Sequence, residues 1–306
     1  MSKQNNKIGQ TINYQILKWM LIIVLIPILS ISFYHLQAYD KSFKQQSFAM
    51  LDQIADKKTY QIEQFLADRI RDAQLAALVP TTREAINALG PMFKQRLDNE
   101  KGNQKILNRY GQYLQPFLES GYYDIFLISP TRDIVFSLKQ EDDLHTNLTT
   151  GIYADTALAE SVKQAFLLQE PSLSAIKYYP PSKELAAFIS APVLEKNLII
   201  GVIAFQVDMK SLRAIVDNNT GLGLSGDTNI VTIDNQQAIF LNHPHKTLKS
   251  IQSEVNPIFS FSEAMQKALQ GNTGHMITFD HFRNEEVLAS YRYLPDLSAE
   301  IGRAHV

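Results

Sequence analysis

Three glycines have a spacing that could hold a phosphate group. Gly221, Gly223 and Gly226 spell G-x-G-x-x-G, the pattern with which a strand-to-helix turn approaches the pyrophosphate of a dinucleotide. That chemistry needs a strand before the glycines and a helix after them. Here the preceding residues look helical and a β-rich run follows, so we interpret the glycines as turn residues between two modules.

Two other groups of residues could hold a metal ion. His243-Pro244-His245 offers two imidazoles, but no acid or third histidine is close in sequence, which favours a turn. Glu141, Asp142 and Asp143 are consecutive and lack the alternating spacing of a calcium loop, so we interpret them as a solvated acidic turn. We therefore expect neither a metal nor another cofactor.

The composition excludes several further kinds of chemistry. The chain of 306 residues has no cysteine, which rules out disulfides, thiolate catalysis and cysteine metal sites. No serine elbow, paired-carboxylate signature or zinc-binding helix is present. The net charge is -2, and acids and bases are mixed along the chain, so the sequence offers no basic patch of the kind that binds nucleic acid. We expect that this chain is not itself an enzyme.

An apolar run near the N-terminus predicts a membrane anchor. Residues 16–35 contain one charge, Lys18, and about twenty apolar residues suffice to cross a bilayer as a helix. Trp19 and Tyr34 lie near the two ends, as interfacial aromatic residues do. The segment 1–15 carries lysines and no acid, which places it in the cytoplasm. A cleaved signal peptide is the alternative, but no small-x-small cleavage site follows the run, which favours an uncleaved anchor.

The region 36–120 is expected to be helical, beginning with a long stalk. No glycine or proline interrupts 36–78, and its apolar residues recur at spacings of three, four and eight, which predicts one apolar stripe on a helix. At 1.5 Å per residue, such a helix extends roughly 60 Å beyond the membrane. Pro80 and Pro91 are expected to break the pattern, and a second amphipathic stretch covers 104–118.

Two α+β modules with antiparallel sheets follow, at 121–217 and 218–300. The expected elements of the first are a hairpin, a helix and three more strands, at 122–128, 134–138, 154–168, 174–179, 185–192 and 198–207. Those of the second repeat this order in reduced form, at 229–234, 238–242, 259–269, 273–280 and 287–294.

Several stretches resemble the double Cache family of bacterial sensor domains. GYYDIFLISPTRDIVFSLKQEDDLHTNL, ADTALAESVKQA, AAFISAPV and IIGVIAFQVDM resemble its membrane-distal module, and TGLGLSGDTNIVTID resembles the start of its membrane-proximal module. The resemblance covers roughly 40–297. It implies an α+β fold in which an N-terminal transmembrane helix and a long stalk helix carry two PAS-like modules with antiparallel sheets.

The same resemblance implies a function. Such chains are extracytoplasmic ligand-sensing regions of bacterial transmembrane receptors, anchored in the inner membrane and acting as homodimers. A chemoreceptor signalling domain, a histidine kinase or a nucleotide cyclase usually follows, and none of these is encoded in this sequence. The alternatives are the regulatory half of a membrane histidine kinase or cyclase, and a stand-alone anchored solute-binding protein.

The resemblance also implies a small-molecule pocket in the distal module, between the sheet and the loops over it. Aromatic walls with a few polar groups are typical of such pockets. The candidate ligand-binding residues are Tyr153, Asp155, Tyr178, Tyr179, Phe188, Ser190, Gln206 and Asp208. Side chains alternate along a strand, so residues 188 and 190 are expected to share one face, as are residues 206 and 208.

One departure from the family bears on the ligand. The amino-acid-binding branch carries a Tyr, Arg, Trp and Asp signature, whereas the only tryptophan here is Trp19, in the apolar run, and Gln206 stands where the aspartate is expected. This argues against amino-acid binding in that manner. Lys177 or Arg132 could pair with a carboxylate, which hints at organic acids.

The last residues, 301–306, have a different expected origin. IGRAHV can be encoded by ATC GGA AGA GCA CAC GTC, a sequence common in sequencing-adapter DNA, and its two preceding bases would complete the codon of Glu300. Our hypothesis is that the natural sequence ends near Ala299, so that the second module is incomplete and His305 carries no chemistry. A genuine short tail is the alternative.

Overall fold

The computed structural model describes residues 2–95, 100–223, 225–234, 237–242, 256–257, 262–281, 284–297 and 299–305. These form two compact units, Met1–Met50 and Leu51–Val306. The first unit is the N-terminal part of helix α1, which runs over Ser2–Leu78 with Pro27 inside it. The pair His243 and His245 lies outside the described residues.

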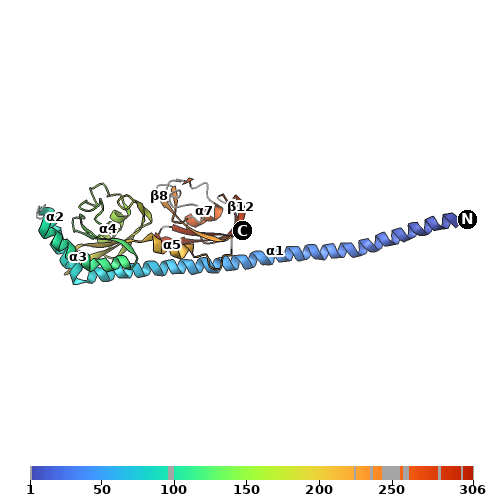
Figure 1. Ribbon diagram of the computed structural model, residues 1–306, viewed down its shortest axis with the longest axis horizontal. Helices are drawn as coiled ribbons and strands as arrows, with labels where there is room; N and C mark the ends of the chain where they lie inside the picture. Colours follow the sequence, from blue (N-terminus) through green and yellow to red (C-terminus); the bar gives the residue numbers. More distant parts are fainter. Residues whose placement is uncertain are drawn as a thin grey trace. The chain divides into compact units, whose positions relative to one another are not determined.

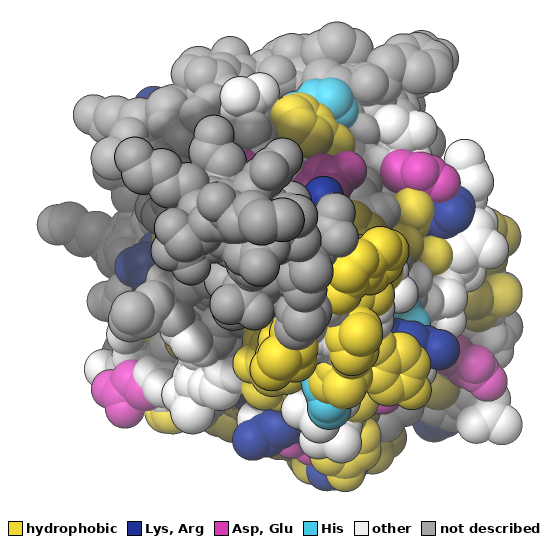
Figure 2. Space-filling model, turned by 90° about the vertical axis from the view of Figure 1, so that its right-hand side faces the viewer, with side chains coloured by type: hydrophobic (Ala, Val, Ile, Leu, Met, Phe, Trp, Pro, Cys, Tyr) yellow, Lys and Arg dark blue, Asp and Glu magenta, His cyan; other side chains and the backbone are white. Residues whose placement is uncertain are grey.

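The described part of α1 has the length and composition of a membrane span. Within Lys18–Leu78, no part of the most apolar window of 18 residues is buried by the rest of the protein. Trp19, Ile23 and Leu29 are each more than half exposed. Figure 2 shows hydrophobic side chains gathered on the face that it presents.

The helical region continues as expected, with one difference. Helix α2 covers Pro80–Gln95 and α3 covers Glu100–Glu119. Pro80 and Pro91 were expected to break helical structure, but Pro80 is the first residue of α2 and Pro91 lies within it. A proline is tolerated at a helix start because the first N–H groups of a helix have no partner within it.

Five described strands form the distal sheet, in the order β2-β1-β7-β6-β3, and all pairs are antiparallel. Their bounds are Tyr122–Ile128 (β1), Ile134–Ser137 (β2), Ser172–Leu173 (β3), Phe188–Glu195 (β6) and Leu198–Val207 (β7). A separate hairpin pairs β4, Lys177–Tyr179, with β5, Glu184–Ala186. The expected single strand at 174–179 is therefore broken: the Ser174 hydroxyl accepts the Phe188 N–H at 2.9 Å, in place of a backbone carbonyl.

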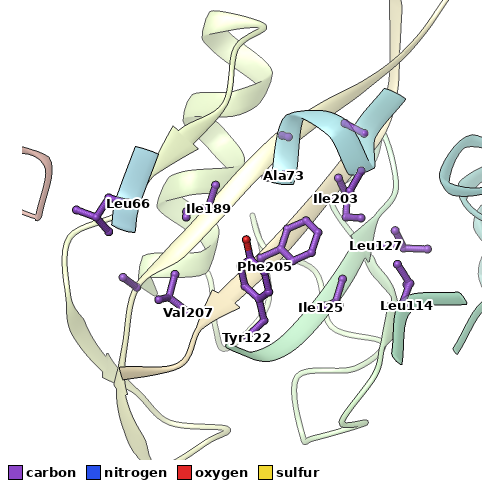
Figure 3. Packing of buried hydrophobic residues seen from close by; sticks show 14 of the residues in the cluster. Leu66, Ala73, Leu114, Tyr122, Ile125, Leu127, Ile189, Ile203, Phe205 and Val207 are labelled. Carbon is purple, nitrogen blue, oxygen red and sulfur yellow. The ribbon is translucent and has the colours of Figure 1, made fainter. Parts of the chain in front are cut away.

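The two faces of the distal sheet are covered by different helices. Leu66 and Ala73 of α1 pack with Ile125, Ile203 and Phe205 on one face, as Figure 3 shows. The other face packs against α4, Ala157–Leu168, through residues such as Phe126 and Ala204. Neighbouring residues of one strand thus face the stalk and α4 in turn, since side chains alternate with period two. Figure 1 shows α1 running along one side of this module and α4 within it.

Helix α5, Met209–Asp217, leads into the proximal sheet. Its described strands are ordered β10-β9-β8-β13-β12-β11. Their bounds are Asp227–Asp234 (β8), Gln237–Phe240 (β9), Asn256–Pro257 (β10), Gly274–Asp280 (β11), Glu285–Leu294 (β12) and Ala299–His305 (β13). Helix α7 covers Glu263–Leu269, and a 3-10 turn covers Pro295–Leu297.

Strand β13 includes residues 301–305, which the adapter hypothesis places outside the natural sequence. It lies between β8 and β12, with Ile301 opposite both Ile230 and Arg292. Sheet hydrogen bonds are made by the backbone, which any sequence supplies. The adapter hypothesis for 301–306 therefore stays a prediction, which genomic resequencing through codon 300 tests.

The glycine motif lies between α5 and β8, so a helix precedes it and a strand follows it. Gly221 and Gly223 have positive φ angles of 87° and 69°, which glycine adopts without strain. This order is the reverse of a dinucleotide site, and the interpretation as turn glycines is confirmed.

Candidate functional site

One row of side chains crosses the distal sheet on the face away from α1. Asp124 of β1 is in register with Gln206 of β7, which is in register with Phe188 of β6. Paired residues of antiparallel strands project to the same side. Phe188 belongs to the hydrophobic cluster with α4, so the whole row faces α4 and the loop 139–156. We call the polar and aromatic groups gathered there the distal cluster.

Aromatic rings form the apolar part of the distal cluster. The Tyr179 ring meets the Phe188 ring edge to face, with centroids 4.7 Å apart. Phe126 lies 6.1 Å from Phe188 and Tyr153 lies 6.4 Å from Tyr179, again between ring centroids. Tyr179, Phe188 and Phe126 are fully buried. These rings exclude water from the carboxyl groups beside them.

Asp124 is a fully buried carboxyl group held by four donors. The Ser137 hydroxyl donates to its Oδ2 at 2.7 Å, and the N–H groups of Ile125, Leu138 and Lys139 donate to its Oδ1. Burial nevertheless raises the pKa of Asp124 to about 7, and the nearby charge of Asp143 raises it further against the effect of the hydrogen bonds.

Asp143 and Glu141 extend the cluster from the loop after β2. The Tyr179 hydroxyl donates to Asp143 Oδ2, and the Tyr123 hydroxyl donates to Glu141 Oε1 at 2.7 Å. Burial raises the pKa of Asp143, and the charges of Glu141 and Asp142 add to this effect. Asp143 is fully buried, so the expectation that these acids form a solvated turn is wrong for it.

Three oxygens of the distal cluster lack a hydrogen-bond partner in the described part of the chain. They are Glu141 Oε2, Asp143 Oδ1 and Gln206 Oε1, each shielded from solvent. The other end of the Gln206 amide is occupied, since its Nε2 donates to Ser182 Oγ at 3.1 Å. Buried acceptors without donors are costly, and a bound molecule that donates hydrogen bonds would relieve that cost.

The structure brings together half of the residues proposed from the sequence. Tyr153, Tyr179, Phe188 and Gln206 lie in the distal cluster.

The other four are placed elsewhere. Ser190 is buried and its hydroxyl meets that of Ser161 at 2.7 Å. Asp208 follows the end of β7 and caps α5, accepting the Lys210 N–H, so it does not share a face with Gln206. Asp155 is exposed and Tyr178 is about half exposed.

The sequence reasoning missed Asp124 and the burial of Asp143. A lone acid inside the apolar run YYDIFLI was a signal, because an unpaired charge is rare in a buried strand. Nothing local distinguishes Asp143 from the exposed Asp142 beside it.

The two basic residues proposed to hold a carboxylate are engaged elsewhere. Lys177 pairs with Glu160 at 3.2 Å near the surface, and the Arg132 guanidinium lies 5.0 Å from the Phe166 ring centroid. In the described ranges, no lysine, arginine or histidine side chain forms an ion pair with Asp124, Asp143 or Glu141. Nor do the described residues contain a group of His, Cys, Asp and Glu arranged to hold a metal ion.

A second polar group, the stalk clamp, joins α1 to the proximal sheet. It consists of Asp52, Asp56, His275, Ser290 and Arg292. Ser290 Oγ and Arg292 Nη2 donate to Asp52 Oδ1, His275 Nδ1 lies 2.7 Å from Asp52 Oδ2, and Arg292 Nε donates to Asp56 Oδ1 at 2.6 Å. The serine and the histidine contact separate oxygens of one carboxylate, so this is not a nucleophile activated by its base.

We expect Arg292→Ala to loosen the stalk clamp. It removes the hydrogen bonds to Asp52 and Asp56, and should lower the free energy of unfolding by about 1–2 kcal/mol. The expected loss is this small because Asp56 is exposed, and exposed ion pairs contribute little to stability. Urea unfolding of the full chain in detergent measures this. Lys267→Ala, which breaks an exposed pair with Glu263, is the control and should cost less than about 0.5 kcal/mol. Equal losses in the two variants would contradict a special role for the clamp.

A buried lysine joins α1 to the junction of the two modules. Lys58 is 4 % exposed, and its Nζ donates to the Val216 carbonyl in α5 and to Thr228 Oγ1 in β8 at 2.9 Å. A cation near the C-terminal end of a helix is stabilised by the helix dipole. Through this lysine, the stalk contacts the segment that connects the distal and proximal sheets.

No protein-family model matches the chain, and no curated protein matches it in sequence. Solved structures do match its fold. The histidine kinase DctB sensor domain of V. cholerae has 14% identity and a TM-score of 0.57, with 87% of this chain and 97% of that chain covered.

Two chemoreceptor domains are similar in the same way. The ligand-binding domain of the Pseudomonas aeruginosa PAO1 amino acid chemoreceptor PctB, solved with L-Arg, has 14% identity and a TM-score of 0.51, covering 85% of this chain and 95% of that one. The ligand-binding domain of the Pseudomonas fluorescens chemoreceptor CtaA, solved with L-leucine, has 12% identity and a TM-score of 0.52, covering 87% and 97%.

At these identities the likeness shows the fold. These neighbours are Cache sensor domains, so the expected α+β fold, with a long N-terminal helix and PAS-like antiparallel sheets, is confirmed. They are sensor domains rather than catalytic domains, which agrees with the absence of a catalytic motif from the sequence.

Proposed function

We propose, from the fold shared with these sensor domains, that the chain is the extracytoplasmic ligand-sensing region of a bacterial transmembrane signal-transduction receptor. A small molecule binds at the distal cluster. The observation that carries the proposal is the set of buried oxygens without donors, Glu141 Oε2, Asp143 Oδ1 and Gln206 Oε1, enclosed by aromatic rings. Convergent polar groups within an apolar enclosure are typical of a ligand site.

The apolar part of α1 anchors this region in the inner membrane. Its exposed hydrophobic side chains would be solvated by lipid, and Lys3 and Lys7 before it keep the N-terminus in the cytoplasm. The residues after the span then lie in the periplasm. The chain acts as a homodimer, in which two stalk helices carry the signal together.

The distal sheet connects the proposed ligand site to the stalk helix α1. Along β7, Gln206 faces the distal cluster, whereas Phe205 and Val207 belong to the hydrophobic cluster that includes Leu66 and Ala73 of α1. A ligand that shifts β7 by an ångström or so therefore moves the surface on which α1 packs. Small displacements of packed helices are a common form of receptor switching.

The output domain is of chemotaxis or two-component type. The regulatory part of a membrane histidine kinase is favoured by the DctB sensor domain, whose fold matches over 87% of this chain. A nucleotide cyclase output or a stand-alone solute-binding protein are the remaining alternatives from the sequence.

Thermal unfolding of the full chain in detergent, with panels of amino acids, amines and dicarboxylates, tests the binding proposal. A ligand at a hundred times its dissociation constant should add about 2.7 kcal/mol to the free energy of unfolding. The shift should vanish in Gln206→Ala and persist in Lys163→Ala, an exposed position on α4. If no compound stabilises the chain, or if both variants respond alike, the distal cluster is not a ligand site.

A further inference from the structure

The unsatisfied groups of the distal cluster are all of one kind. Glu141 Oε2, Asp143 Oδ1 and Gln206 Oε1 are acceptors, and among the fully buried side-chain atoms of the cluster in the described residues no donor lacks a partner. Gln206 is 2 % exposed and lies in register between Asp124 and Phe188, so its free oxygen points into the cluster. A molecule that completes this site must donate hydrogen bonds.

The charge of the distal cluster favours a ligand that carries a positive charge. Asp124, Asp143 and Glu141 come from two segments and have no cationic side chain paired with them in the described residues. Burial and the charges of neighbouring acids raise the pKa values of Asp124 and Asp143, which shows that their negative charge is poorly compensated. Buried charges in proteins are as a rule paired with an opposite charge or hydrogen-bonded.

These properties discriminate among ligand classes. A dicarboxylate would add negative charge and bring no donor to three free acceptors. A metal ion would need several ligating side chains at coordination distance, and the described residues contain no such group. An organic ammonium brings both positive charge and N–H donors. The rings of Tyr179, Phe188 and Tyr153 suit its carbon chain and the cation itself.

We infer that the distal cluster binds a small organic amine, whose ammonium group is held by Asp143, Glu141 and Gln206, and that it has no counterpart for a ligand carboxylate. This inference rests on the proposed function and narrows it to one ligand class. Tyr153 is 9 % exposed and its ring centroid lies 6.4 Å from that of Tyr179, so the amine would enter past the loop 151–156 that carries it. The ammonium takes Asp143 Oδ1, while the Tyr179 hydroxyl keeps Oδ2.

The test compares probes that share a carbon chain and differ in their ends. Calorimetric titration of the full chain in detergent uses butylamine and 1,4-diaminobutane against butane-1,4-diol, succinate and 4-aminobutanoate. The two amines should bind and the diol and succinate should not. 4-Aminobutanoate should bind more weakly than butylamine, because its carboxylate would lie near uncompensated acids.

Matched variants locate the binding. Asp143→Asn and Glu141→Gln keep the shape of each side chain and should each weaken amine binding by roughly tenfold or more, the loss expected for a hydrogen bond to a charged group. Glu170→Gln, which changes an exposed acid after α4 that is outside the cluster, should leave it unchanged. The unfolding midpoint of each variant without ligand shows whether it folds. If only one of Asp143→Asn and Glu141→Gln folds, that variant alone provides the test.

The outcomes separate this inference from the proposed function. Binding of succinate or 4-aminobutanoate in preference to the amines would overturn the ligand class and keep the sensor proposal. Amine binding that survives both Asp143→Asn and Glu141→Gln would place the site elsewhere and overturn the inference. Binding of no probe and of no panel compound would overturn the proposed function as well.

Discussion

Asp124→Asn is expected to make the chain more stable at alkaline pH and to remove much of the pH dependence of its stability. Burial raises the pKa of Asp124 to about 7, above the ordinary value of 3.8 for an aspartate. Between about pH 4 and pH 7 the folded state therefore holds a proton that the unfolded state has lost. The stability from this group is present at low pH and is lost as pH rises through about 7, by on the order of a few kcal/mol.

Asparagine reproduces the neutral form of Asp124 at every pH. Its Oδ1 can accept the three N–H groups that meet the aspartate oxygen, and its Nδ2 can donate to the Ser137 hydroxyl. Urea unfolding of the full chain in detergent, across this pH range, measures the slope. Part of the pH dependence should remain in the variant, because burial also raises the pKa of Asp143.

Asp142→Asn is the control for this prediction, since Asp142 is exposed in the same loop as Asp143. It should reduce the slope far less than Asp124→Asn does, and only through its effect on the pKa of Asp143. Two results would contradict this prediction: a wild-type chain that gains stability as pH rises from acid to neutral, or an Asp124→Asn variant that is less stable than wild type at every pH. Either would show that the four hydrogen-bond donors to Asp124 stabilise its charged form more than burial destabilises it.

Gly201→Ala should destabilise the distal module by about 2 kcal/mol or more, because its added methyl group has no room. A Cβ at this position in β7 would lie 2.4 Å from the Ile128 carbonyl oxygen and 2.9 Å from Ile86 Cγ2 of α2. The first contact is with backbone, so β7 and β1 would have to separate. Since β7 is the central strand, the damage should extend to the distal cluster and to the packing of α1.

Gly111→Ala is the matched control for the same substitution. A Cβ there would lie 3.7 Å from Leu138 Cδ1, an ordinary van der Waals contact, and the residue lies inside helix α3. Alanine is favoured over glycine in a helix by roughly 0.5–1 kcal/mol, so this variant should be as stable as wild type or more so. Urea midpoints of both variants give the comparison, and similar losses would mean that Gly201 is not closely packed.

Local patterns in the sequence were enough to predict most elements and the kind of fold. The unbroken stretch 36–78 predicted a helix, and α1 runs through it; the apolar run LIIGVIAFQV predicted a central strand, and β7 is that strand. Such predictions succeed because hydrophobic periodicity and the effects of glycine and proline act over a few neighbouring residues. The family resemblance added the PAS-like arrangement that the solved sensor domains share.

The candidate site was predicted only in part. Tyr179, Phe188 and Gln206 were proposed and lie together, because they belong to strand ends near one loop. Asp208 was proposed by strand alternation, but β7 ends at Val207, and a short polar side chain just before a helix satisfies the free N–H groups of that helix instead.

Which acids are buried, and which groups they contact, depends on how distant parts of the chain fold together. Asp124 reaches Gln206 because β1 pairs with β7 across more than seventy residues of chain, and Asp143 reaches Tyr179 because the loop after β2 folds back over the sheet. Asp142 and Asp143 are adjacent and chemically identical, yet one is exposed and the other is fully buried. Burial and the pKa shifts that follow from it depend on strand order and loop path, and neither is encoded in the spacing of neighbouring residues.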